Sequence, residues 1–238
     1  MSGSALKLLM MVLMVFDHIG AFISPSMAAF FHFITRPVAP VFAYMAVEGF
    51  IYTKDVKKYL SRLYLFGSLM YFGNFILNNY IIKNPINYVY NNIIMTIALG
   101  VTGLYIYENL YLKKNKLQGI ILLLFVGILS IFTEGGILIY PFILICYIHR
   151  DNNFKRNIIL CGITAFLLPT AIVPYETKKM TIEMFFMNSD ILLPVAGIPF
   201  MYLYNGKRGN NSNFMKYIFY IFYPMHLWMI AIIADKFI

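Results

Sequence analysis

The sequence contains few charged residues and almost no cysteine. Only 12% of its 238 residues are Asp, Glu, Lys or Arg, and the acidic residues number 10. Soluble globular domains carry about 25% charged residues, so this scarcity excludes an ordinary soluble domain. The two cysteines, Cys146 and Cys161, lie in apolar stretches without the spacing of a metal or redox motif. We therefore expect neither a disulfide nor a bound metal.

Apolar residues take the place of the missing charges. They make up 61% of the chain, and its mean hydropathy is +0.72. This composition predicts an all-α, polytopic membrane protein, because the bilayer admits only spanning segments whose backbone groups are all hydrogen-bonded. Apolar runs of about 20 residues predict about nine transmembrane helices, within a range of eight to ten, in a single membrane-embedded domain over residues 1–238. The predicted spans are residues 5–23, 37–53, 60–81, 89–111, 117–133, 136–149, 157–174, 184–204 and 214–235.

Two details of this layout are open. Only Thr133–Gly136 separate the fifth and sixth spans, which form either a tight helical hairpin or a re-entrant segment. The first span could also be mistaken for a signal peptide. Asp17 and His18 interrupt the part that a signal peptide keeps apolar, so we expect a retained helix.

Basic residues alternate between successive loops. With the N-terminus in the cytoplasm, 14 of the 19 Lys and Arg residues fall on the cytoplasmic side. This asymmetry favours a cytoplasmic N-terminus, an external C-terminus and an odd number of spans. The basic residues of these loops also account for the net charge of +9. Because no nucleic-acid recognition motif is present, we expect no nucleic-acid binding. The five basic residues on the external side are Arg36, Lys83, Lys178, Lys179 and Lys236.

An ionisable pair, Asp17 and His18, lies near the middle of the first apolar segment. Such groups are costly inside a bilayer and usually functional. Neighbours on a helix point about 100° apart, so each needs a partner on another helix, and Arg36 and His226 are the candidates. His18 would then act as a general base while Asp17 pairs with a cation or a second histidine. The alternative is a polar clamp that only holds helices together.

The last span carries His226 just after a proline. Pro224 cannot donate to the carbonyl of Tyr220, which predicts a kink and a free carbonyl beside the imidazole. His226 is therefore as plausible a catalyst as a packing residue. The other two histidines, His32 in the first external loop and His149 at a cytoplasmic helix end, are expected to be exposed and non-catalytic.

Three basic residues, Lys54, Lys58 and Arg62, recur every fourth position. On a helix they form one stripe that could bind the phosphates of a cytoplasmic donor. The alternative is that they set the topology and touch anionic lipid.

Other polar residues also lie within the predicted spans. Glu48 must be paired or protonated, so it binds either a cationic substrate group or a basic side chain from another helix. Asn74, Asn91 and Asn92 either form hydrogen bonds across helices or contact a substrate.

Several sequence blocks, in order over nearly the whole chain, resemble the TraX family. They are Met14–Gly20, Arg36–Pro37, Pro40–Tyr44, Glu48–Thr53, Lys58–Leu63, Asn92–Gly100 and Lys216–Leu227. That family is associated with acetylation of the amino terminus of conjugative pilin. It is similar to a wider group of membrane acyltransferases that use cytosolic acyl-coenzyme A. The resemblance places Asp17, His18, Arg36, Glu48, Arg62, Asn92 and His226 at motif positions.

The resemblance implies a multi-pass acetyltransferase of the bacterial cytoplasmic membrane. It would move an acetyl group from acetyl-CoA to an amine or hydroxyl acceptor, such as a peptide N-terminus, a glycan or another envelope component, directly or through an acyl-histidine. The implied catalytic residues are His18, Asp17, His226 and Arg36. Lys54, Lys58 and Arg62 would bind the donor, and Glu48 and Asn92 the substrate.

Two other classes of function remain open. Buried ionisable groups also suit a small proton-coupled secondary transporter, although the sequence shows no evident repeat. A non-catalytic assembly subunit would use the same groups for helix packing alone.

Overall fold

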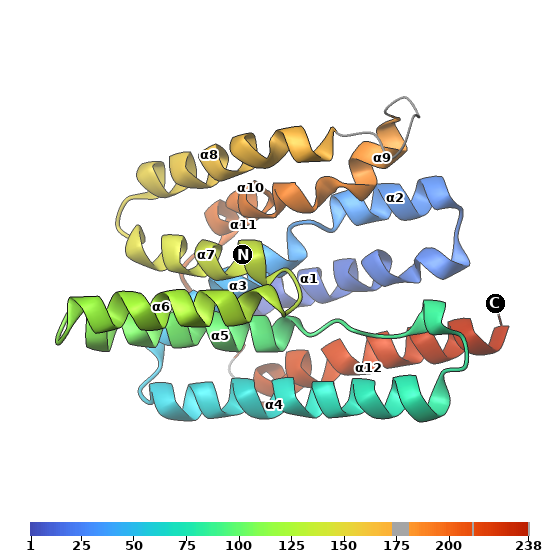
Figure 1. The fold of residues 1–238 in the computed structure, drawn as a ribbon, viewed down its shortest axis with the longest axis horizontal. Coiled ribbons are helices and arrows are strands. Elements are labelled where there is room, and N and C mark those ends of the chain that lie inside the picture. The colour runs from blue at the N-terminus through green and yellow to red at the C-terminus, as the bar shows by residue number, and fades with distance from the viewer. Residues whose placement is uncertain (173–180, 211, 238) are drawn as a thin grey trace. The chain divides into compact units, whose positions relative to one another are not determined.

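A computed structural model describes residues 1–172, 181–210 and 212–237, and these residues form helices and connecting turns with no strand (Figure 1). Lys178, Lys179 and the last two residues of the predicted span 157–174 lie outside the described residues. The α-helices are α1 (Gly3–His18), α2 (Pro25–Ile34), α3 (Val38–Tyr52), α4 (Val56–Ile76), α5 (Ile93–Ile106), α6 (Lys116–Ile131), α7 (Gly136–Ile148), α8 (Asn153–Ala171), α9 (Ile182–Met187), α10 (Leu193–Ala196), α11 (Ile198–Leu203) and α12 (Asn213–Phe237). Shorter 3₁₀ or π segments are η1 (Ile19–Phe22), η2 (Leu77–Ile81), η3 (Pro85–Asn87), η4 (Tyr107–Tyr111) and η5 (Ser189–Leu192).

Length and hydropathy identify an all-helical membrane protein. Within the described residues, 4 helical stretches are long and apolar enough to cross a membrane, namely Gly3–Phe22, Pro25–Tyr52, Ile93–Tyr111 and Phe214–Phe237. The predicted class is thus confirmed, whereas the count of nine spans stays a prediction. Three further apolar helices are shorter: Lys116–Ile131, Gly136–Ile148 and Ser189–Leu203.

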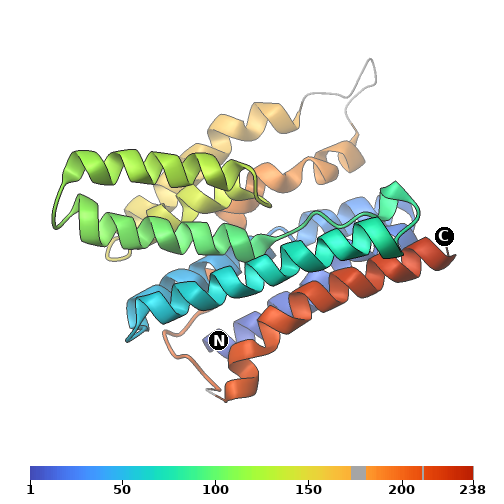
Figure 2. The same cartoon turned by 60° about the horizontal axis from the view of Figure 1, so that its bottom comes forward.

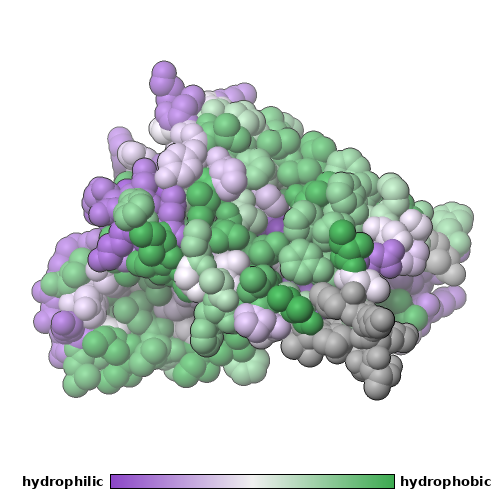
Figure 3. All heavy atoms as spheres, turned by 90° about the horizontal axis from the view of Figure 1, so that it is seen from above, coloured by the Kyte–Doolittle hydropathy of each residue, from purple (hydrophilic) through white to green (hydrophobic). Residues whose placement is uncertain are grey.

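Large apolar side chains lie on the outside of the helices, as a lipid environment requires. Apolar groups cover most of the face drawn in Figure 3. Phe166 on α8 is 83% exposed and Leu124 on α6 is 64% exposed. In water such a surface would drive aggregation, whereas hydrocarbon solvates it without cost.

The segment before the second predicted span is helical, contrary to the expected external loop. The Ser24 hydroxyl accepts the backbone N–H of Met27, and Pro25 occupies the first turn of α2. This serine and proline are a strong start signal for a helix. The predicted span 37–53 therefore belongs to a longer helical stretch, Pro25–Tyr52.

The predicted span 184–204 is a broken helix. It comprises α9, η5, α10 and α11, with Pro194 and Pro199 each in the first turn of a new helix. Proline lacks a backbone N–H, so it suits a helix start better than a helix interior. These breaks place Asp190 in a turn within the segment.

The fifth and sixth predicted spans form a tight hairpin, one of the two expected arrangements. Helix α6 ends at Ile131 and α7 begins at Gly136. Gly135 has φ of 62°, and a Cβ at Gly136 would lie 1.7 Å from the Ser130 carbonyl oxygen. The turn therefore requires glycine at both positions.

The helices divide into two compact units that interleave along the chain, and each is described by itself. Unit 1 comprises Met1–Phe42, Leu77–Val89 and Asn157–Ile238, and unit 2 comprises Ala43–Ile76 and Tyr90–Arg156. In unit 1, α1 packs against α12 and α2, and α2 against α9. In unit 2, α5 packs against α4, α6 and α7 (Figure 2). The single domain over residues 1–238 stays a prediction.

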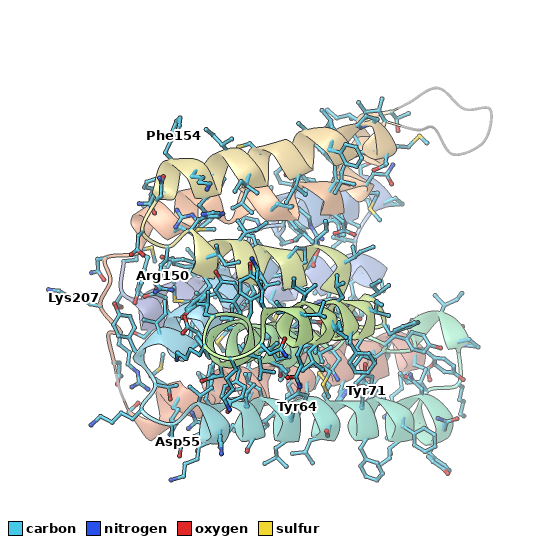
Figure 4. All side chains as sticks on the ribbon, turned by 60° about the vertical axis from the view of Figure 1, so that its left-hand side comes forward. Asp55, Tyr64, Tyr71, Arg150, Phe154 and Lys207 are labelled. Carbon is cyan, nitrogen blue, oxygen red and sulfur yellow. The ribbon has the colours of Figure 1, made fainter. Side chains whose placement is uncertain are left out.

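Basic loops gather at one end within each unit. In unit 2, Asp55 before α4 and Arg150 after α7 lie at the same end, while Tyr64 and Tyr71 follow along α4 (Figure 4). In unit 1, the Gly3 backbone N–H donates to the Lys207 carbonyl at 2.9 Å, which brings a basic loop to the start of α1. This grouping agrees with the alternation of basic loops, and the cytoplasmic location of the N-terminus stays a prediction.

Candidate functional site

Unit 1 contains an ionic group that we call the arginine cluster: Asp17, His32, Thr35, Arg36 and Asp190. The Arg36 Nη2 atom donates to both carboxylate oxygens of Asp17, at 2.7 and 2.9 Å. Its Nη1 donates to Asp190, and its Nε donates to the His32 carbonyl at 2.6 Å. The predicted pairing of Asp17 with Arg36 across helices is therefore present.

The cluster carries more negative than positive charge. Two carboxylates face one guanidinium, which leaves one negative charge in excess when His32 is neutral. Arg36 is 8% exposed, and the Asp190 side chain is 60% exposed. The buried Thr35 hydroxyl also donates to Asp17 Oδ1, at 2.7 Å. The cluster thus extends from a buried arginine to an accessible carboxylate.

His32 is a member of this cluster, and its expected place in an exposed loop is wrong. Its side chain is 22% exposed, with Nδ1 3.3 Å from Asp17 Oδ1 and Nε2 3.6 Å from Asp190 Oδ1. The Nε2 atom is buried and has no hydrogen-bond partner. His32 lies in the last turn of α2, and Arg36 follows it by four residues, in the turn between α2 and α3. The four-residue spacing of His32 and Arg36 could have placed His32 in the cluster. No sequence motif indicated that Asp190 belongs to it.

Two imidazoles from α1 and α12 form what we call the histidine pair. The ring centroids of His18 and His226 lie 5.4 Å apart. His226 is 3% exposed, and its Nδ1 is 2.9 Å from the Phe222 carbonyl oxygen. A carbonyl can only accept, so Nδ1 donates, and in the neutral ring the lone pair lies on Nε2. This Nε2 is buried without a hydrogen-bond partner, so a neutral His226 can accept a proton there as a general base.

One expectation about these histidines needs correction. The imidazole of His226 binds the carbonyl of Phe222, one turn earlier, and the free carbonyl of Tyr220 stays a prediction. His18 is the last residue of α1, about 24 Å from the start of that helix at 1.5 Å per residue. It therefore lies in the last quarter of the Gly3–Phe22 stretch and not near its middle.

An apolar groove of about 420 Å³ runs beside the histidine pair, between α1 and α12. Phe222, which accepts the His226 hydrogen bond, contributes to its wall and stacks on the His226 ring at 5.1 Å. The lining suits hydrocarbon better than a polar thioester arm. The lining residues are Leu8, Met11, Val12, Val15, Phe16 and Phe222.

The predicted basic stripe is shorter than expected. The Asp55 carboxylate accepts the backbone N–H of Lys58 at 2.9 Å, so α4 begins at Val56 and Lys54 precedes it. Only Lys58 and Arg62 lie on the helix. The Lys58 side chain is 85% exposed, whereas the Nε of Arg62 is buried without a hydrogen-bond partner. These residues belong to unit 2, and the histidine pair to unit 1.

The buried Asn92 forms hydrogen bonds within unit 2, and its role in substrate binding stays a prediction. Its Oδ1 accepts the backbone N–H of Met95 at 3.1 Å, and its Nδ2 donates to the Gly67 carbonyl at 2.9 Å. Asn74 likewise donates to the Asn91 carbonyl at 3.0 Å. The expected hydrogen bonds across helices are therefore confirmed.

Glu48 lies in a second charged region, on α3 of unit 2. It follows Tyr44 by one helical turn, and the guanidinium of Arg156 lies 6.0 Å from the Tyr44 ring centroid. Arg156 is only 3% exposed. It is a buried cation on α8 that the sequence did not single out, because the predicted layout placed it in a basic loop between two spans.

Comparison with known proteins decides the family. The model of the TraX protein family matches residues 2–234. The chain belongs to the TraX family. The chain is also 25% identical over 239 residues to a probable fimbrial assembly protein FimC, serogroup H1, from Dichelobacter nodosus, with 97% of this chain and 94% of the relative covered. No solved structure matches. The resemblance seen in the sequence blocks is thus confirmed over nearly the whole chain.

Proposed function

We propose that this TraX-family chain is a membrane-embedded acyltransferase of the bacterial cytoplasmic membrane. It moves an acetyl group from acetyl-CoA to the terminal amine of a fimbrial or pilin subunit. The observation that carries the proposal is the histidine pair, in which the Nε2 of His226 is buried without a hydrogen-bond partner and can accept a proton when the ring is neutral. The similarity to a fimbrial assembly protein supports an amine on such a subunit as acceptor, in preference to a hydroxyl.

The chemistry requires one base near the reacting atoms. The acceptor nitrogen attacks the thioester carbonyl carbon, and His226 Nε2 takes the proton that this nitrogen loses. The carbon–sulfur bond then breaks, and the leaving thiolate takes the proton from the imidazolium. An imidazole suits both steps because it can accept a proton at one ring nitrogen and return it from the same atom. The neighbouring His18, 5.4 Å away, could take the same part or carry the acetyl group as an acyl-histidine.

Arg62 and Lys58 on α4 are candidates for binding the phosphates of the donor. Arg62 has a buried Nε that lacks a hydrogen-bond acceptor, and an anionic oxygen would satisfy it. Lys58 lies one helical turn away and is exposed. Lys54, outside the helix, could add charge attraction but does not share that face.

The test is acetyl transfer by the purified full-length protein in detergent. The donor is radiolabelled acetyl-CoA, and the acceptor is a synthetic peptide with a free α-amine, compared with the same peptide already acetylated. We expect label in the free peptide only, and a loss of about 100-fold or more in His226→Gln. His149→Gln, which changes a histidine in unit 2, is the matched control. Wild-type protein that never labels the free peptide would contradict the proposal.

A proton-coupled transporter is the second candidate, because Asp17, His32 and Arg36 form an ionic group within helical stretches that suit the membrane. It predicts proton-driven uptake by reconstituted vesicles and no acetyl transfer in detergent. An enzyme requires no gradient, so activity in detergent separates the two.

A further inference from the structure

Acetylation of a peptide amine at neutral pH releases a proton. The α-amino group has a pKa of about 7.7–8.0, so most of it is ammonium at pH 7. An ammonium has no lone pair and cannot attack the thioester. Ammonium and thioester therefore yield amide, thiol and one free proton. A buried site needs a route by which this proton leaves before the nitrogen reacts.

The arginine cluster has the charge to accept a proton. Its two carboxylates, Asp17 and Asp190, face only one guanidinium, that of Arg36. A proton on His32 would make the group neutral.

The geometry places His32 between the buried and the exposed carboxylate. Its Nδ1 faces Asp17 at 3.3 Å, and its Nε2 faces Asp190 at 3.6 Å without any hydrogen-bond partner. The side chains become more accessible in this order, from 21% for Asp17 to 60% for Asp190. Asp17 is also the sequence neighbour of His18, a member of the histidine pair.

The other charged groups around His32 do not remove the excess negative charge. Arg36 Nη2 lies 3.0 Å from His32 Nδ1, and its positive charge is already included in the balance against the two carboxylates. Glu183 on α9 binds Ser26, which is near the start of α2 and about two turns from His32. This third acid adds negative charge near the start of α2.

We propose that His32 and Asp190 carry the proton of the acceptor ammonium from the buried site to water. The N–H bond of the ammonium breaks and a bond to the His32 imidazole forms, which leaves the acceptor amine neutral. The imidazolium then passes the proton through the Asp190 carboxylate to water and returns to its starting state. His32 and Asp190 are here proton-transfer residues that act before the thioester is attacked. The inference rests on the proposed acyl transfer.

The test compares His32→Gln and Asp190→Asn with wild type in the peptide acetylation assay, from about pH 6 to pH 9.5, a range that brackets the acceptor pKa. We expect a loss of tenfold or more at the acid end. The loss should vanish at the alkaline end, because a neutral amine needs no proton route. Added imidazole should restore the acetylation rate of His32→Ala at low pH. It should leave the acetylation rate of the control His149→Ala unchanged.

The outcomes separate this inference from the proposed function. A wild-type protein that transfers no acetyl group contradicts acyl transfer itself, and the proton route with it. An active wild type whose two variants lose the same factor at every pH, without rescue by imidazole, overturns the proton route alone. Thermal unfolding of each variant in detergent shows that the fold is retained, since a purely structural role would lower Tm and the rate together.

Discussion

Polar side chains are buried in both units, but they are used differently. In unit 2, the fully buried Thr96 hydroxyl donates to the Glu134 carbonyl at 2.7 Å, and Asn91 donates to the Glu134 carboxylate at 2.9 Å. Asn92 caps α5 and binds Gly67. In this group, mostly neutral amides and hydroxyls find acceptors on nearby backbone or side chains.

The arginine cluster of unit 1 instead concentrates ionised groups. It retains an excess negative charge, and His32 keeps a buried nitrogen without a hydrogen-bond partner. Burying polar groups costs free energy in both places. The group around Thr96 and Asn92 in unit 2 recovers that cost by hydrogen bonding, whereas the arginine cluster in unit 1 retains an imidazole nitrogen without a hydrogen-bond partner. The comparison indicates that buried polar side chains mark a candidate site when some of their atoms lack hydrogen-bond partners.

The largest effect should follow from Arg36→Ala. Removing the guanidinium leaves the Asp17 and Asp190 carboxylates facing each other without a cation. Loss of one partner from a buried ion pair costs about 3–5 kcal/mol, so we expect a marked fall in Tm in detergent. Arg36→Lys keeps the charge and should lose less. An unchanged Tm in Arg36→Ala would show that the cluster contributes nothing to folding.

Thr35→Val should have the next largest effect on stability. It keeps the shape of the side chain but removes the hydroxyl that donates to Asp17 at 2.7 Å. A hydrogen bond to a charged group is worth about 1.5–3 kcal/mol, and Tm should fall accordingly. Thr35→Ser retains the hydroxyl and serves as the control. Equal loss in both variants would assign the effect to packing.

Asn92→Ala tests the contrasting group in unit 2. Loss of the helix cap costs about 1–2 kcal/mol, so Tm should fall while the acetylation rate per folded molecule stays at the wild-type value. Asn92→Ser keeps a capping oxygen for the N–H of Met95 and loses the amide donor to Gly67, so it should be less affected. A specific loss of rate would assign Asn92 to substrate binding.

The smallest effect should come from Asp55→Ala, at the exposed start of α4. The backbone N–H of Lys58 lowers the pKa of Asp55, so its capping is complete above the usual pKa of about 3.9. The contribution is lost as the pH falls through the lower pKa of the folded state. Wild type should have a slightly higher Tm at pH 7, and the difference should shrink under strongly acidic conditions. A difference independent of pH would exclude the charged cap.

Much of the helical layout followed from the sequence, because apolar runs and capping residues act locally. The hairpin at Thr133–Gly136 and the long last helix are examples. Helix α2 was missed because its apolar run is short, although Ser24 and Pro25 marked its start. The break in the 184–204 segment was missed because hydropathy does not register where proline removes a backbone donor.

The candidate site residues that stand out by composition were predictable. Those that join the site through contacts between distant parts of the chain were not. Asp17, His18, Arg36 and His226 stood out because ionisable side chains are rare in apolar runs. Asp190 did not, because nothing local links it to a residue 154 positions earlier. His32 was assigned to a loop, and its partners became apparent only when that loop proved to be a helix.

The sequence by itself determined that this is a helical membrane protein of the TraX family with a few costly ionisable groups, because hydropathy and motif blocks are properties of the chain alone. Only the tertiary structure decided which of those groups meet. The packing of α1 against α2 and α12 joins residues that are distant along the chain. The charge balance of the arginine cluster and the nitrogen atoms without hydrogen-bond partners result from these contacts. The contacts depend on distances in space that no local sequence pattern specifies.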